Sequence, residues 1–221
     1  KKLVLIKKNI YKNPKKFSFL KFSNNKEIFN NLKKFKKKFQ NIDKFLLIGT
    51  GGSSLGTKAL ISIYNKFNIE FLENLDPNTV NQYFKNNKNN SFGLLVVSKS
   101  GETLEVLGLF DIILSKLKTK LNLSNRIIII TDNTESTLRK IAIKNNIVVL
   151  DHDESIGGRF SCFSLTSLLP LYLLGVNSIK LKHLADKCFR KNLAINNFAS
   201  NISISIMANI INEKTYVGHV F

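Results

Sequence analysis

The chain has 221 residues, 43% of them hydrophobic, and a formal net charge of +19. This length fits one large domain or one and a half ordinary ones, and the apolar fraction is enough for a real core. Although the charge would normally indicate a nucleic-acid or membrane partner, fifteen lysines against two acids lie in residues 1–44, and only four of the 34 basic residues are arginine. We therefore attribute the charge to biased lysine usage and expect no nucleic-acid partner.

The predicted elements alternate between strand and helix after a basic N-terminal segment. Residues 27–42 carry apolar side chains at helical spacing, which predicts an amphipathic helix. Five short apolar runs predict buried strands at 45–48, 69–72, 94–97, 126–130 and 147–150. Helical patterns cover about 55–67, 102–117, 136–144, 164–174, 178–190 and 193–212, with the start of a strand at 214–221. We expect an α/β fold: three layers, with a mainly parallel five-stranded sheet flanked by helices, flavodoxin- or Rossmann-like.

Two further observations concern the compartment. Cys162 and Cys188 have no metal-ligand spacing and fit a reducing cytosol, so we expect a cytoplasmic protein without a metal. Residues 160–179 carry no charge and could in principle span a bilayer. Their serines, threonine, proline and asparagine favour a buried helix near a ligand site instead, so we expect no membrane partner.

The first strand is followed by a glycine-rich loop, Gly49-Thr50-Gly51-Gly52-Ser53-Ser54. Exposed amides at such a turn, together with the positive end of the next helix, hold an anion. The loop also resembles the dinucleotide fingerprint GxGxxG, but Ser54 replaces the third glycine and neither Glu73 nor Asp76 stands cleanly at the end of the second strand. We expect no nucleotide cofactor.

The third strand is followed by Ser98-Lys99-Ser100-Gly101-Glu102-Thr103. Three hydroxyls and an ammonium at the start of a helix make a second anion cradle, although ordinary N-capping by Ser100 or Thr103 would need the same residues. Glu102 would repel an anion here, and its carboxylate either points outward or contacts a neighbouring backbone amide. Two such loops on neighbouring strands indicate a phosphate monoester as ligand.

A third turn, Gly157-Gly158-Arg159-Phe160-Ser161, follows the fifth strand. The planar guanidinium of Arg159 can donate two parallel hydrogen bonds to one oxyanion, and the glycines admit a ligand closely. The alternative is a plain glycine turn with a surface arginine. His152, just before this turn, is expected to be a hydrogen-bonded loop residue rather than a catalyst.

GTGGSSLG, SKSGET and IGGRFS, in this order, resemble the glucose-6-phosphate isomerase family, and the first two resemble sugar-isomerase (SIS) domains in general. The resemblance covers roughly residues 44–175. It implies that Ser53, Ser98, Lys99, Ser100 and Thr103 bind the substrate phosphate, that Gly52 and Gly158 line the substrate, and that Arg159 stabilises an anionic intermediate. It also implies aldose–ketose isomerisation through a cis-enediolate, a sugar phosphate as ligand and a full-length homodimer. Glu102 departs from the family, which usually has threonine there.

On this resemblance we expect residues 1–43 to be an N-terminal segment, 44–178 a first SIS domain, and 179–221 the lead-in to a second. Both ends look cut, because the chain does not begin with methionine and residues 214–221 read as a strand that has barely started. No convincing general base occurs, since the family's base and ring-opening residues come from segments past Phe221. We therefore expect this chain alone to be inactive. The alternative function is a phosphosugar-sensing SIS domain of a regulator, or another sugar-phosphate isomerase.

Overall fold

A computed structural model describes residues 26–42, 44–64, 68–86, 92–117, 125–184 and 187. The helix predicted at 193–212 and the strand predicted at 214–221 lie outside these residues, as does most of the predicted N-terminal segment. The chain divides into two compact units, Ser23–Lys180 and a second made of Lys1–Phe22 with Leu181–Phe221. The first unit holds all the elements named below, and the domain boundaries expected from the sequence stay a prediction.

Five parallel strands form one sheet in the order β2-β1-β3-β4-β5, which confirms the predicted α/β fold. The strands are β1 (Phe45–Ile48), β2 (Ile69–Leu72), β3 (Gly93–Val97), β4 (Ile127–Asp132) and β5 (Val148–His152). Every residue of β1 and β3 is buried, because helices cover both faces of these central strands. Each bound lies within two residues of the sequence prediction.

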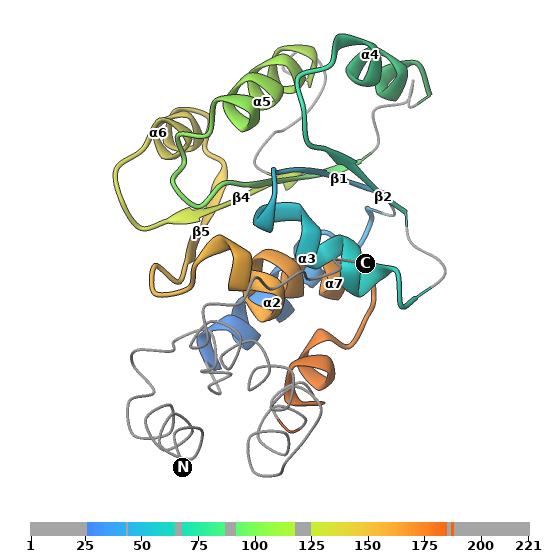
Figure 1. Cartoon of the computed structure of the whole chain (residues 1–221), viewed down its shortest axis with the longest axis vertical. Helices are drawn as coiled ribbons and strands as arrows, with labels where there is room; N and C mark the ends of the chain where they lie inside the picture. Colours follow the sequence, from blue (N-terminus) through green and yellow to red (C-terminus); the bar gives the residue numbers. More distant parts are fainter. Residues whose placement is uncertain are drawn as a thin grey trace, which may run out of the picture. The chain divides into compact units, whose positions relative to one another are not determined.

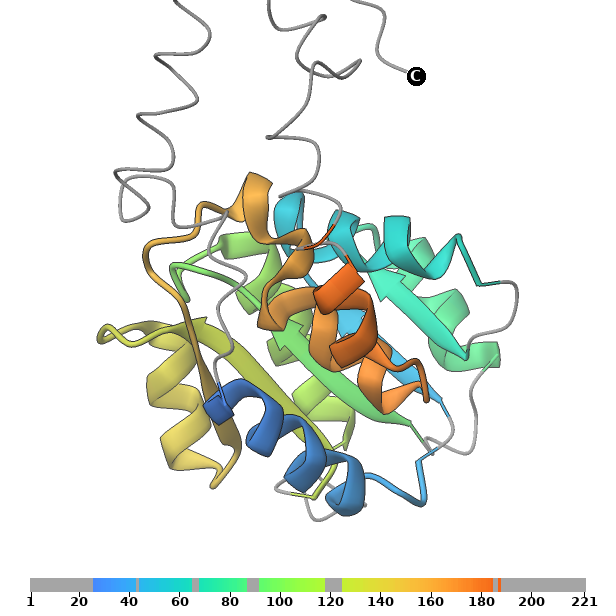
Figure 2. The ribbon, with the colours of Figure 1, turned by 90° about the horizontal axis from the view of Figure 1, so that it is seen from below.

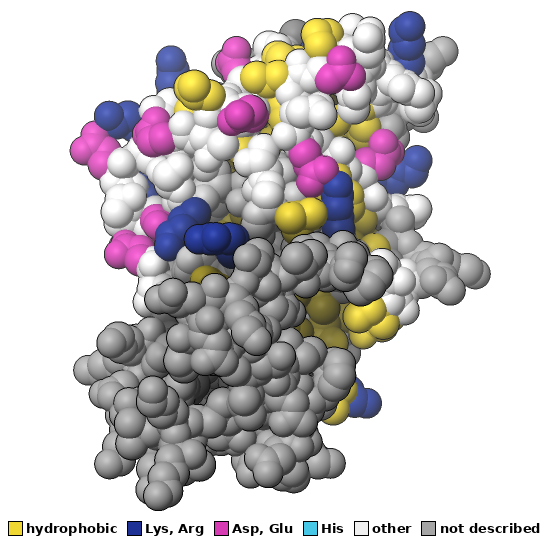
Figure 3. Space-filling model, in the orientation of Figure 1, with side chains coloured by type: hydrophobic (Ala, Val, Ile, Leu, Met, Phe, Trp, Pro, Cys, Tyr) yellow, Lys and Arg dark blue, Asp and Glu magenta, His cyan; other side chains and the backbone are white. Residues whose placement is uncertain are grey.

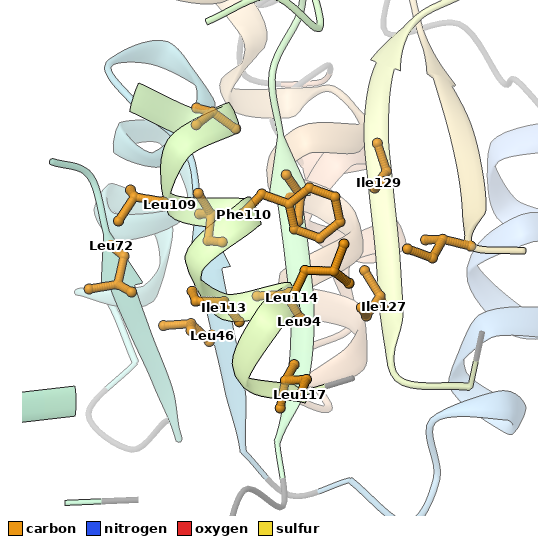
Figure 4. Close-up of a cluster of buried hydrophobic side chains, with 14 of the residues drawn as sticks. Leu46, Leu72, Leu94, Leu109, Phe110, Ile113, Leu114, Leu117, Ile127 and Ile129 are labelled. Carbon is orange, nitrogen blue, oxygen red and sulfur yellow. The ribbon is translucent and has the colours of Figure 1, made fainter. Parts of the chain in front are cut away.

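Alternating side chains along the strands build two separate cores. Leu46, Leu94 and Ile127 face one side, where they pack with the apolar stripe of α5 (Leu104–Leu117), as Figure 4 shows. Their neighbours Leu47 and Leu95 face the other side. This period of two is what a pleated strand buried on both faces requires.

Helices α4 (Pro77–Asn86), α5 and α6 (Thr137–Lys144) lie on the first face of the sheet (Figure 1). Helices α2 (Lys26–Lys38), α3 (Gly52–Ile61) and α7 (Leu165–Leu173) lie on the second, where Figure 2 shows α2 and α7 in front of the strands. A 3-10 turn, η3 (Gly158–Phe163), leads into α7. The predicted three-layer arrangement is therefore confirmed.

Helix α4 was not predicted from the sequence. Its start carries a clear signature: the carboxylate of Asp76 accepts hydrogen bonds from the amides of Asn78 (3.2 Å) and Thr79 (2.9 Å), and Pro77 takes the first helical position. Val80 and Tyr83 anchor the helix on the sheet. Two buried side chains in a polar stretch gave too weak a periodic signal.

Of the uncharged residues 160–179, those up to Leu173 form the end of η3 and then α7, which is buried as expected and has Ser164 as its N-cap. In the part of the chain that the structure describes, no helix is long and apolar enough to cross a membrane. On the face drawn in Figure 3, basic and acidic side chains of the described residues are interspersed.

Candidate functional site

The strand order places two loops at the centre of one sheet edge. From β1 the chain runs to β2 on one side, and from β3 it runs to β4 on the other. Ile48 pairs with Val96 in the register, so β1 and β3 end side by side. In open parallel sheets, ligands bind in the crevice at this reversal of strand order. The loops that follow β1 and β3 therefore meet where the fold favours a ligand.

The first loop folds tightly over the end of β3. Gly51 has φ of +54°, a conformation that favours glycine. A Cβ on Gly49 would lie 3.1 Å from the carbonyl oxygen of Val97, so the loop also touches the neighbouring strand. Ser53 stands in the first turn of α3, and its hydroxyl makes no hydrogen bond within the described part of the chain. That hydroxyl is available to a ligand.

Ser54, the next residue, is used internally. Its buried hydroxyl donates to the carboxylate of Glu73 (2.5 Å), and the carbonyl oxygen of Gly51 lies 3.2 Å from the same hydroxyl. Glu73 also pairs with the ammonium of Lys58. Burial works to raise the pKa of Glu73, but the hydrogen bonds from Lys58 and Ser54 outweigh it and hold this pKa below its ordinary value. The carboxylate of Glu73, which directly follows β2, is therefore bound to side chains of α3. This contact is a further departure from the dinucleotide fingerprint.

The second loop is closed on itself by its own hydroxyls. The hydroxyls of Ser98 and Thr103 lie 2.9 Å apart, and the Ser98 oxygen accepts the amide of Gly101 at 3.2 Å. Gly101 has φ of +68°, and a Cβ there would lie 2.3 Å from the hydroxyl oxygen of Ser136. Ser100 is exposed and accepts the amide of Glu102 at 3.2 Å. The loop presents a small rigid cluster of hydroxyls and amides.

Glu102 does not face this cluster. Its carboxylate accepts the backbone amide of Thr137 at 2.5 Å and the Thr137 hydroxyl at 2.8 Å, at the N-terminus of α6. Of the two possibilities left by the sequence, the contact with a neighbouring amide is confirmed. These bonds hold the pKa of Glu102 below its ordinary value, and the negative charge is stabilised at a helix N-terminus.

The third turn packs directly on the first loop. A Cβ on Gly52 would lie 2.2 Å from the carbonyl oxygen of Gly158, so the two backbones touch where the sequence has two glycines. The hydroxyl of Ser161 lies between the carbonyl oxygens of Gly158 (2.6 Å) and Gly52 (3.0 Å), which share its one proton. Arg159 is exposed, and within the described residues its guanidinium makes no hydrogen bond or ion pair.

Lys99 joins the second loop to the third turn. Its ammonium donates to the carbonyl oxygens of Glu154 and Ile156, each at 2.9 Å. Its own carbonyl oxygen accepts the amide of Asp132 (2.9 Å) and the hydroxyl of Thr131 (3.2 Å). These contacts could not be predicted from the sequence, because the bonded residues are 32 to 57 positions apart in the chain.

His152 lies at the end of strand β5 rather than in a loop, and it is 4% exposed. Its Nδ1 lies 3.2 Å from the carboxylate of Asp132, at the end of β4. Burial lowers the pKa of His152 more than the charge of Asp132 raises it, and nearby Lys99 lowers it further. The neutral ring therefore donates its Nδ1–H to Asp132. This agrees with the expectation that His152 is a hydrogen-bonded residue.

The structure thus brings the three predicted motifs together at one sheet edge. Gly52 and Gly158 are in backbone contact, Ser98 and Thr103 share a cluster, and Ser53 and Arg159 have side chains free of internal hydrogen bonds among the described residues. Among the predicted phosphate ligands, Lys99 has its ammonium bound to two backbone carbonyls that precede the third turn.

The family model described as phosphoglucose isomerase matches residues 24–211 of the chain. A glucose-6-phosphate isomerase of Methanocaldococcus jannaschii is 33% identical over 153 residues, which cover 68% of this chain and 37% of that protein. A probable glucose-6-phosphate isomerase of Methanococcus maripaludis is 33% identical over 180 residues, which cover 77% and 39%. The chain therefore spans less than half of the length of these relatives.

Two solved structures share the fold of this chain. A hypothetical protein from Thermus thermophilus superposes with a TM-score of 0.75 at 25% identity, over 84% of this chain and 46% of that one. A glucose-6-phosphate isomerase from Chlamydia trachomatis superposes with a TM-score of 0.62 at 25% identity, over 71% and 31%.

Proposed function

Because this chain belongs to the phosphoglucose isomerase family, we propose that its protein interconverts glucose 6-phosphate and fructose 6-phosphate, and that the described edge is the sugar-phosphate site. The observation that carries the proposal is the contact of Gly52 with Gly158. This contact joins the loop that carries Ser53 to the turn that carries Arg159. The regulator alternative is not favoured, because the matched relatives bear the names of isomerases.

The phosphate is held by hydroxyls and amides in this proposal. Ser53 and the Ser98–Thr103 loop surround the reversal point of the sheet, and the positive end of α3 begins there without a side-chain cap. Ser100 is exposed beside this cluster and adds a third hydroxyl. Glu102 is bound to Thr137, so its charge is turned away from the ligand.

Arg159 acts on the sugar end. Isomerisation moves a proton between C1 and C2 through a cis-enediolate, whose oxyanion needs a cation beside it. The guanidinium of Arg159 is exposed and unpaired among the described residues, and its planar shape can donate two parallel hydrogen bonds to one oxyanion. Anchoring the phosphate holds the reacting carbons near this cation, which is how distant binding contacts lower a barrier.

A general base is not assigned to any described residue. His152 precedes the Arg159 turn but is buried and bound to Asp132. The 221-residue chain is therefore proposed to bind sugar phosphate without isomerising it. Formation of fructose 6-phosphate by the purified chain, followed with a coupled dehydrogenase assay, would contradict this part of the proposal.

Calorimetric titration tests the site. Glucose 6-phosphate should bind the chain, and glucose, which lacks the phosphate, should not. Ser98→Ala should weaken glucose 6-phosphate binding about tenfold, the usual effect of losing one hydrogen bond to a charged group. Ser115→Ala is the matched control, because Ser115 is exposed on α5 and bonds only within its own helix. Equal binding of glucose and glucose 6-phosphate would refute the site.

The whole protein is proposed to be a homodimer, as the family resemblance implies, and to work in the cytoplasm, as its cysteine usage indicates. Light scattering on the full-length protein checks the assembly. A single monomeric species at micromolar concentration would contradict it.

A further inference from the structure

The ammonium of Lys99 is already engaged within the chain, unlike the guanidinium of Arg159 among the described residues. Its two hydrogen bonds go to two carbonyls of one turn, those of Glu154 and Ile156. An ammonium has three donors, so two of the three are used within the chain. Bonds from a charged donor are stronger than neutral ones, so this is a firm attachment.

The segment that Lys99 holds is the one that leads into Arg159. Asp153 starts it by accepting the amide of Ser155 at 3.0 Å, and the amide of Ile156 donates to the carbonyl of Asp153 at 2.9 Å. Gly157 and the η3 turn follow directly. Most of this segment is exposed and has little packing of its own. Its position therefore depends on hydrogen bonds from other parts of the chain, such as those of Lys99.

The other end of Lys99 is fixed just as firmly. Its carbonyl oxygen accepts the Asp132 amide and the Thr131 hydroxyl at the end of β4. Asp132 in turn holds His152, the last residue of β5. The residue therefore connects the phosphate loop, the ends of two strands and the Arg159 turn.

We propose that Lys99 is a positioning residue that ties the turn bearing Arg159 to the phosphate loop, rather than a direct ligand of the phosphate. The inference rests on the proposed function. In this proposal the two parts of the ligand are recognised separately. The hydroxyl cluster binds the phosphate, and the tether, which is the bonded ammonium of Lys99, sets the position of Arg159 beside the sugar.

The test compares two ligands. In Lys99→Met, which keeps the length but loses the ammonium, affinity for inorganic phosphate should change by less than about threefold, whereas affinity for glucose 6-phosphate should fall about tenfold. Lys99→Arg should recover part of the loss, because a guanidinium can still donate to two carbonyls. Lys140→Met is the control for net charge, since Lys140 is exposed and pairs with Glu135; it should affect neither ligand. Equal, large losses for both ligands in Lys99→Met, or no loss for either, would overturn the proposal.

A double-mutant cycle distinguishes a tether from an independent contact. If Lys99 acts through Arg159, Lys99→Met should add little once Arg159→Met is present. Additive losses of glucose 6-phosphate affinity would overturn the proposal.

Hydrogen exchange without ligand separates failure of the tether from failure of the proposed function. Amides 154–159 should exchange faster in Lys99→Met than in the wild type, with the rest of the sheet unchanged. If the wild-type chain binds neither ligand, the proposed function fails. Unchanged exchange at 154–159 would then still refute the tether, and faster exchange confined there would support it.

Discussion

Arg159 and Arg139 illustrate how context decides the role of a side chain. Arg139 donates to the carbonyl oxygen of Asp132 and to the carboxylate of Asp151, so it braces two strand ends. Arg159 has no such partner among the described residues and is exposed beside two glycines. The sequence could rank Arg159 as the functional arginine only through its neighbours, Gly157 and Gly158, because both residues are equally charged.

Gly52 should not tolerate a side chain. Gly52→Ala would place a methyl group 2.2 Å from the carbonyl oxygen of Gly158, which is backbone and cannot rotate away. We expect a loss of about 1–3 kcal/mol in the free energy of unfolding, the usual effect of overpacking, measured by urea denaturation. Gly157→Ala is the matched control, because a Cβ there meets only the edge of Phe160 at 3.4 Å. Equal stability of the two variants would contradict the close contact.

His152 should give the chain a specific pH dependence. Burial lowers its folded pKa below the ordinary 6.5, although Asp132 opposes the shift. As the pH falls below about 6.5, the unfolded chain takes up a proton that the folded one does not, so stability decreases. His152→Gln should flatten the stability profile between about pH 6.5 and 5.

An NMR titration of the imidazole checks the same point directly. The midpoint for His152 should lie below 6.5. A midpoint above 6.5 would mean that the Asp132 charge outweighs burial.

At the scale of elements, strands were easier to predict than helices. Buried central strands give short apolar runs such as Leu94–Val97, and these can be recognised without knowing their neighbours. Helix α4 was not predicted, because only Val80 and Tyr83 are buried in an otherwise polar segment. Asp76 and Pro77 nevertheless mark its start. Capping residues therefore carried information that hydrophobic spacing did not.

The candidate site likewise has features that could be predicted from the sequence and features that could not. Its three motifs could be found because each is local in sequence, from Gly49 to Ser54, Ser98 to Thr103 and Gly157 to Ser161. The bonds of Lys99 and Glu73, and the choice between the two alternatives for Glu102, depend on distant chain segments. No pattern along the sequence determines such pairings.

Helix α6 should depend on Glu102, which caps it from the neighbouring loop. Glu102→Ala removes the acceptor of the Thr137 amide and hydroxyl, so the melting temperature should fall and the first amides of α6 should exchange faster. Because the folded pKa of Glu102 is lowered, this contribution is present above about pH 4.5 and is lost as the pH falls through the folded pKa. Asp111→Ala, at an exposed acid on α5, is the control. Identical melting temperatures at pH 7 would contradict the capping role.

At the scale of the whole molecule, the two cores hold the sheet edge in place. Phe110 on α5 is fully buried among strands β3 and β4 (Figure 4). Phe110→Ala should lower the free energy of unfolding by about 3–5 kcal/mol, a large share of the stability of a domain this size. Ile112→Ala, on the outward side of the same helix and 37% exposed, should cost much less. Similar losses in urea denaturation would contradict the assigned packing.

The central claim is that three motifs form one sugar-phosphate site, and NMR mapping tests it most directly. On titration of the 15N-labelled chain with glucose 6-phosphate, the account predicts saturable shifts of amides in 50–54, 99–104 and 158–160, with inorganic phosphate shifting only the first two groups. Shifts confined to other surfaces, or no saturable shifts at millimolar ligand, would contradict it.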